Sequence, residues 1–279
     1  MRSDSIKLMH YPPLPMEYDF LQKIEAAESP VFSYSVCTLT TRIEEYREMV
    51  DSFIRAGFGR EDCEFLYIDN SAQNHSDAYT GINRFLARAK GEYIIVCHQD
   101  ILIDKDTRND LENKLSELQQ LDQRWAICGN AGAAGPNHIV YHISYPDNVF
   151  KDKGKFPLKV TALDENFLVI KKSAMLATSA DLSGFHLYAT DLCLHAEIRG
   201  FSSWVIAFNL THKSYGNADH TFEQSRRQLI KKYNHAFRNR WIQTPSAVFL
   251  LSGAKLRWFY ANPLALFAVR MWNGIKKRL

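Results

Sequence analysis

The 279-residue sequence lacks several features that would place it in a special class of proteins. No apolar run approaches the roughly 18 residues that a membrane-spanning helix needs. Residues 1–10 are polar and contain no apolar stretch of the kind found in secretory signals, so we expect a cytoplasmic protein. None of the five cysteines lies in a C-x-x-C pair, so we expect buried thiols and no zinc or disulfide framework.

Motifs of several enzyme classes are also missing. The sequence contains no G-x-S-x-G, H-E-x-x-H or P-loop, which argues against the common hydrolases and P-loop enzymes. The glycine-rich stretch 129–135 lacks the G-x-G-x-x-G spacing of a dinucleotide site and runs into Pro136, so we expect a tight loop that approaches a different ligand. The segment from Thr38 to Arg42 contains no glycine, which argues against a nucleotidyltransferase.

Acidic and basic residues are distributed unevenly along the chain. Residues 216–279 carry 12 lysines and arginines against Asp219 and Glu223, a net charge of +10. The rest of the chain, with 22 basic and 29 acidic residues, carries −7. We therefore expect the tail to meet an anionic partner.

The most informative stretch is residues 91–100. Its five consecutive apolar residues, 93–97, are typical of a strand that is covered on both faces. The chain then turns polar at once, with His98, Gln99 and Asp100. Open α/β sheets bind ligands at the carboxyl ends of their strands. His98 and Asp100 could therefore hold a divalent ion that carries a diphosphate.

The preceding residues alternate between strand and helix patterns. We expect strands at 31–39 and 65–68 and helices at 43–56 and 79–89, which together predict an α/β fold with a mostly parallel sheet. The first strand is followed by Thr40 and Arg42, and the second by Asp69 and Asn70. Three polar strand ends at one edge predict a polar cleft.

Further along, we expect a helix at 102–121, buried strands at 125–128 and 167–170, and a helix starting near residue 171. Residues 137–159 are rich in polar and aromatic residues and are interpreted as an excursion that lines the ligand site. A last strand is expected at 204–208.

These residues carry a family resemblance. The stretch from Ala87 to Asp100, ARAKGEYIIVCHQD, together with the segments around residues 35–42 and 68–71, resembles the family 2 glycosyltransferases of the GT-A fold. The resemblance covers about residues 33 to 213 and departs from the family's D-x-D motif by placing His98 first. It divides the chain into an N-terminal extension (1–30), a nucleotide-sugar transferase domain (31–215) and a basic, aromatic helical region (216–279).

The resemblance implies roles for the strand-end residues. Asp69 would read the nucleotide base, while Thr40, Arg42, Asn70 and Gln99 would contact the donor. Asp100 would hold Mn²⁺ or Mg²⁺ on the donor diphosphate. His98 either shares that ion or contacts ribose or phosphate, and both options stay open. His212, which follows the last strand, would complete the metal or diphosphate shell.

The resemblance also implies a catalytic base at the start of a helix near residue 190. Asp191 is the carboxylate available within that motif, and it would deprotonate the acceptor hydroxyl. The alternative for Asp191 is a carboxylate that only stabilises the helix dipole. Asp164 and Glu165 precede a strand and would touch acceptor hydroxyls, or else form a solvated turn.

The implied function is transfer of a sugar from a nucleoside diphosphate, UDP favoured, to a saccharide or lipid-linked acceptor in cell-envelope polysaccharide or glycolipid synthesis, with inversion. A non-catalytic binding member of the same fold is the main alternative, and a nucleotidyltransferase is a further one. The basic tail fits a segment at the inner face of an anionic membrane or a helical subdomain packed on the sheet. It shows no nucleic-acid recognition motif.

Overall fold

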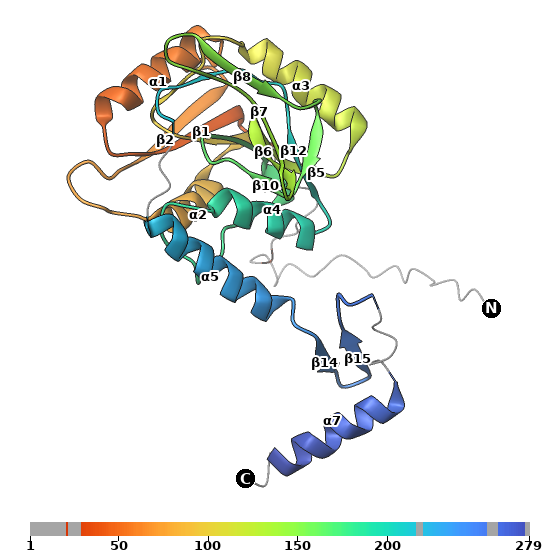
Figure 1. Cartoon of the computed structure of the whole chain (residues 1–279). Helices are drawn as coiled ribbons and strands as arrows, with labels where there is room; N and C mark the ends of the chain where they lie inside the picture. The colour runs from red at the N-terminus through yellow and green to blue at the C-terminus, as the bar shows by residue number, and fades with distance from the viewer. Residues whose placement is uncertain (1–20, 22–28, 216–219, 256–261, 277–279) are drawn as a thin grey trace. The chain divides into compact units, whose positions relative to one another are not determined.

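The computed structural model describes residues 21, 29–215, 220–255 and 262–276. The chain divides into two compact units, Met1–Pro30 and Val31–Leu279. The expected N-terminal extension falls almost wholly outside the described residues. The second unit has an α/β fold with a large central sheet flanked by helices, as the sequence predicted (Figure 1).

The central sheet contains seven strands. In spatial order they are β2 (Cys63–Asp69), β1 (Phe32–Thr40), β3 (Gly91–Cys97), β11 (Phe167–Lys171), β5 (Trp125–Gly129), β12 (Ser202–Val205) and β9 (Leu158–Val160). β1 runs parallel to β2 and β3, and β5 runs parallel to β12. Because β11 is antiparallel to both β3 and β5, five of the seven strands share one direction. The expected mostly parallel sheet is confirmed.

Two layers of helices cover this sheet (Figure 1). One hydrophobic cluster joins the sheet to α1 (Ile43–Arg55) and α3 (Arg108–Leu121). A second cluster joins the other face to α2 (Ala78–Arg88) and α4 (Tyr188–Ile198). Neighbouring residues of one strand serve different clusters, because side chains alternate between the two faces of a sheet. This double burial is the reason that the strands appear in the sequence as unbroken apolar runs.

The order of the sheet depends on a close approach between β1 and β3. A Cβ atom on Gly91 would lie 2.5 Å from the backbone nitrogen of Ser35, a distance that no ordinary side chain tolerates. The Gly91 amide instead donates to the Ser35 hydroxyl at 2.8 Å. Glycine at this position therefore lets β3 lie in register with β1 and carry residues 98–100 to the sheet edge.

A second sheet lies beyond the carboxyl ends of these strands. It contains, in order, β10 (Ala162–Leu163), β6 (Ala131–Gly135), β7 (His138–Tyr145), β13 (Thr211–His212) and β4 (Ile101–Leu102), with β8 (Val149–Lys153) paired to β7. The expected tight loop at 129–135 was wrong, because residues 131–135 form strand β6 against β7. The expected excursion at 137–159 contains β7, β8 and the start of β9.

Two expected helices also differ from the structure. The helix expected at 102–121 begins only at Arg108, since Ile101 and Leu102 belong to β4 and Thr107 forms a capping box with Asp110. The helix expected from residue 171 is a single 3₁₀ turn, Lys172–Ala174.

The C-terminal region contains α5 (His220–Ala236), a hairpin of β14 (Arg240–Gln243) and β15 (Val248–Leu251), and α7 (Pro263–Lys276). The expectation of a purely helical tail therefore misses the hairpin. Tyr233 of α5 is buried and donates a hydrogen bond to Asp191 of α4. In the described parts of the chain, no helix combines the length and the apolar character that a membrane span requires.

Candidate metal centre

Three side chains that sequence analysis selected are brought together at the carboxyl end of β3. His98 directly follows β3, and Asp100 directly precedes β4. The short pairing of β4 with β13 places His212 opposite Ile101, and therefore next to Asp100. The Lys213 amide also donates to the backbone carbonyl of Asp100 at 2.9 Å, which holds the two segments together.

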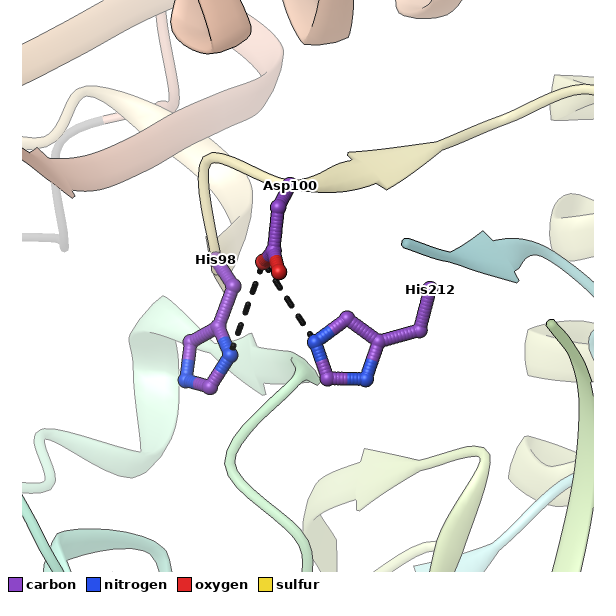
Figure 2. Close-up of side chains that lie close together, drawn as sticks. All are labelled: His98, Asp100 and His212. Atoms are coloured by element: carbon purple, nitrogen blue, oxygen red, sulfur yellow. Dashed lines mark ion pairs between the residues drawn. The ribbon is translucent and has the colours of Figure 1, made fainter. Parts of the chain in front are cut away.

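Figure 2 shows both imidazole rings turned toward the Asp100 carboxylate. His212 Nε2 lies 3.3 Å from Asp100 Oδ1, and His98 Nδ1 lies 4.0 Å from the same oxygen. One ligand atom from each residue lies within 4.8 Å of the other two. The side chains are 40% exposed for His98, 18% for Asp100 and 8% for His212, so the group is open to solvent on the His98 side.

The protonation states suit metal binding. Partial burial, followed by the proximity of His212, lowers the pKa of His98, so its ring stays neutral and keeps a lone pair. Burial alone would raise the pKa of Asp100, but its hydrogen bond and its electrostatic interaction with His212 outweigh burial and lower the pKa. A neutral imidazole beside an ionised carboxylate is the form that a divalent cation requires.

The donor set of two imidazole nitrogens and one carboxylate oxygen fits a first-row transition ion such as Mn²⁺ better than Mg²⁺, which prefers oxygen ligands. Among the residues that the structure describes, this is the one group of three or more such side chains with metal-binding spacing. The Tyr188 hydroxyl lies 3.3 Å from His98 Nε2 and 3.2 Å from the carbonyl of Glu165. Because that carbonyl can only accept, Tyr188 fixes His98 with its Nε2 protonated and its Nδ1 facing Asp100.

The predicted donor-binding residues fall into two groups. The side chains of the first group, Thr40, Gln99 and Asn70, form hydrogen bonds within the protein. Gln99 Oε1 accepts from the Thr40 hydroxyl at 2.7 Å and from the backbone amides of Thr41 and Arg42 at 2.8 and 2.9 Å. Gln99 thus ties β3 to β1 and caps the start of α1, where Arg42 itself provides no cap. Asn70 accepts from the amides of residues 75 and 76 and shapes the loop after β2.

The second group is exposed at the same edge. Asp69 lies next to Thr40 in the β1–β2 register, and its Oδ1 accepts from the Ser71 amide at 2.8 Å. The Ser71 hydrogen bonds lower the pKa of Asp69 and keep it ionised. Arg42 is exposed and pairs with Glu45 at 2.8 Å. Both side chains can therefore reach a ligand at the edge.

Asp191 does not belong to this open edge. Its side chain is fully buried. Its Oδ2 accepts from the Ser179 amide at 2.7 Å, and its Oδ1 accepts from the Ser179 hydroxyl at 2.7 Å and from the Tyr233 hydroxyl at 2.6 Å. With both oxygens occupied and no exposed surface, Asp191 cannot receive a proton from an acceptor hydroxyl. The prediction of Asp191 as the base is corrected to a structural role that links α4 to α5.

The two acidic residues predicted on the acceptor side differ from each other. Asp164 is exposed, and its Oδ1 accepts from the amide and side chain of Asn166 at 3.0 and 2.6 Å. Glu165 is half-buried, and its Oε1 is fully buried without a hydrogen-bond partner among the described residues. Burial, followed by the charge of Asp164, raises the pKa of Glu165 to about 8.

Sequence analysis missed Asn130, Asn166, Tyr188, Ser179 and Tyr233. Asn130 and Asn166 carry buried side-chain atoms that find no partner in the described part of the chain. Asn130 could have been found from the sequence, because it is a polar residue directly after a buried strand, β5, as His98 is after β3. Ser179 and Tyr233 gave no signal, because their importance depends on a contact with Asp191 that only the fold creates.

Comparison with known proteins gives one clear relative. No family model matches the chain. The chain is 31% identical over 245 residues to "ATP synthase subunits region ORF 6" from Fuscovulum blasticum, which covers 86% of this chain and 97% of that protein. A name of this kind states no activity.

Two solved structures are more distant. The crystal structure of S. aureus TarS 1–349 is 12% identical, covering 74% of this chain and 72% of that chain with a TM-score of 0.44. The inositol-1-phosphate CTP transferase from T. maritima is 12% identical, covering 73% and 98% of the two chains with a TM-score of 0.36. At these identities and TM-scores the likenesses assign no activity.

Proposed function

The chain belongs to the family of the Fuscovulum blasticum ORF 6 protein, and we propose that it is a metal-dependent glycosyltransferase acting on a nucleoside diphosphate sugar. The observation that carries the proposal is the group of His98, Asp100 and His212 at the carboxyl edge of a mostly parallel sheet. Ligands of α/β sheets bind at this edge. The exposed Asp69 lies at the end of β2, two strands away in the same sheet.

In this proposal, different residues bind different parts of the donor. Asp69 accepts a hydrogen bond from the nucleobase, and Arg42 lies where it can pair with a phosphate. Thr40, Gln99 and Asn70 hold the strand ends and loops in place around the donor. His98, Asp100 and His212 would hold Mn²⁺, which would neutralise the negative charge that grows on the departing diphosphate.

A binding experiment tests this proposal without knowledge of the sugar or the acceptor. The melting temperature is measured with UDP, GDP, dTDP and CDP, each with and without Mn²⁺ or Mg²⁺. A ligand at 100 times its Kd stabilises the folded state by about 2.7 kcal/mol. We expect a rise of several degrees with UDP and Mn²⁺ together, and a smaller rise with Mg²⁺.

The rise should need both components, because His98, Asp100 and His212 would hold the ion on which the diphosphate depends for binding. A folded sample whose melting temperature does not respond to any nucleotide with either ion would overturn the proposed function. Binding of a donor without release of its nucleotide would favour the non-catalytic alternative.

The C-terminal helix suggests where the acceptor is found. Leu264, Phe267, Met271 and Ile275 of α7 are 81%, 64%, 55% and 49% exposed and follow a helical spacing of three and four residues. Residues 216–279 carry a net charge of +10. An exposed apolar face within a basic segment suits the interface of an anionic membrane, so we propose that the acceptor is lipid-linked or membrane-bound.

Co-sedimentation with vesicles tests this contact. The full chain should bind vesicles that contain phosphatidylglycerol more strongly than vesicles of phosphatidylcholine alone. Phe267→Asp should weaken that binding by about tenfold or more, because a carboxylate disfavours both the apolar boundary and the anionic lipid. Ile198→Asp, at another exposed apolar side chain outside the tail, is the matched control. Equal binding by the two variants would contradict the membrane contact.

A further inference from the structure

Several buried polar atoms at the sheet edge have no hydrogen-bond partner among the residues that the structure describes. Asn130 follows β5, and Asn166 precedes β11. Both amide atoms of Asn130, Oδ1 of Asn166 and Oε1 of Glu165 are buried and find no hydrogen-bond partner within the described residues. Native proteins rarely leave such atoms unpaired, so water, an ion or a ligand is expected to pair with them, or the group has a catalytic role.

The strand registers place these atoms next to the metal centre. Phe167 lies opposite Cys97 on β3, and the next residue toward the edge, Asn166, accepts at its carbonyl from the His98 amide at 3.0 Å. On the other side of β11, Leu168 lies opposite Gly129, so Asn130 follows at the same edge. The unpaired atoms therefore surround the start of β11, one strand from His98.

Glu165 is the ionisable member of this group. Its carbonyl accepts from the Tyr188 hydroxyl, which also contacts His98 Nε2. Its carboxyl faces the amino end of α4, where the backbone amides of residues 187–189 favour the ionised form. The amino end of α4 thus does hold a carboxylate, but it comes from the β10–β11 loop and not from Asp191 of the helix itself.

A purely structural role explains Glu165 poorly. A helix cap needs only a neutral acceptor, such as serine or asparagine. A buried carboxyl with an unpaired oxygen costs free energy that such a cap would avoid. Carboxylates held in this way are typical of groups that exchange a proton with a substrate.

We propose that Glu165 is the catalytic base that deprotonates the acceptor hydroxyl, an inference that rests on the proposed transferase function. The hydroxyl proton passes to the Glu165 carboxylate as the hydroxyl oxygen forms its bond to the anomeric carbon. The bond from that carbon to the diphosphate oxygen breaks, and its electron pair leaves with the diphosphate. Glu165 then returns the proton to solvent.

The pH dependence of the reaction rate should follow the ionisation of the Glu165 carboxyl. Its pKa is raised to about 8, so the fraction of active carboxylate grows from pH 6 to pH 8. The titratable groups that face it are Asp164 in its own loop, Tyr188 on α4 and Tyr79 on α2. Burial raises the pKa of both tyrosines, so they stay neutral across this range. Removing the Glu165 carboxyl should therefore flatten the rise.

Slow donor hydrolysis, with water in place of the acceptor, provides the assay. UDP release is measured from UDP-glucose, UDP-galactose and UDP-N-acetylglucosamine with Mn²⁺, for the wild type, Glu165→Gln and the control Glu197→Gln, at an exposed position near the end of α4. Glutamine keeps the volume of the side chain and still accepts from the α4 amides. Binding of UDP with Mn²⁺ is measured on the same samples by calorimetry.

We expect Glu165→Gln to bind UDP and Mn²⁺ within about threefold of the wild type while its UDP release falls at least about 100-fold and loses its rise toward pH 8. Glu197→Gln should keep the release and the pH profile of the wild type. Release by Glu165→Gln close to that of the wild type, with the same pH profile, would overturn the proposal and leave Glu165 as a cap of α4.

Two further outcomes are decisive in different ways. A wild type that binds UDP with Mn²⁺ but releases no UDP from any of the three sugars would also overturn the proposal, because a poised base would act on water. A wild type that fails to bind UDP, GDP, dTDP and CDP alike with Mn²⁺ would overturn the proposed function itself. The calorimetry therefore separates failure of the base from failure of the transferase.

Discussion

Replacing Asp100 with asparagine is expected to lower the affinity for Mn²⁺ at least about 100-fold and donor turnover about 1,000-fold. Asp100 supplies the one anionic ligand of the group, and both imidazoles face it. The hydrogen bond with His212 lowers its pKa, so the wild-type carboxylate is fully charged at neutral pH. Asparagine keeps the shape of the side chain but removes that charge.

The substitution should leave the fold intact, because the asparagine oxygen can still accept from His212. Calorimetry with Mn²⁺ alone measures the affinity, and thermal melting without metal measures the fold. Asp147→Asn, a change of the same kind at an exposed turn residue, is the control. If Asp100→Asn binds Mn²⁺ as the wild type does, these three side chains are not the metal site.

Replacing Asp191 with alanine is expected to lower the free energy of unfolding by about 3–5 kcal/mol. The carboxylate accepts three hydrogen bonds, and the substitution would leave the Ser179 amide, the Ser179 hydroxyl and the Tyr233 hydroxyl without their acceptor. A buried donor without a partner costs about 1–3 kcal/mol. Urea unfolding, analysed for both the midpoint and the slope, measures the loss.

Tyr233→Phe provides the graded comparison, since it removes one of the three hydrogen bonds and should cost about 1 kcal/mol. The folded fraction of Asp191→Ala should still bind UDP with Mn²⁺, because Asp191 has no exposed surface at the metal centre. Wild-type stability combined with lost UDP release would reverse this assignment and return Asp191 to the role of base.

The sequence predicted the central strands well because they are buried on both faces. The runs at β1, β3 and β5 supply residues to both hydrophobic clusters, so their pattern shows in the sequence without any tertiary knowledge. The strands of the second sheet were harder to predict. β6 contains only alanine and glycine, which have little strand preference, and it exists because β7 and β10 pair with it.

In the site, too, the features set by neighbouring residues were predictable, and those set by contacts between distant residues were not. His98 and Asp100 were predictable because they follow a buried strand within three residues. The direction of Asp191 was not predictable, since it is set by Tyr233, which lies 42 residues further along the chain. Glu165 was selected for its place before a strand, but its burial against α4 depends on the packing of a helix that begins at Tyr188.

The unpaired atoms of Asn130, Asn166 and Glu165 have a consequence for how this protein would respond to selection. Each atom destabilises the fold, so substitutions that remove them should raise heat resistance while harming activity. Variants chosen for thermal stability alone should therefore accumulate changes at the start of β11 and the end of β5. The positions that change in such a selection would identify the functional edge of the sheet, even without knowledge of the acceptor.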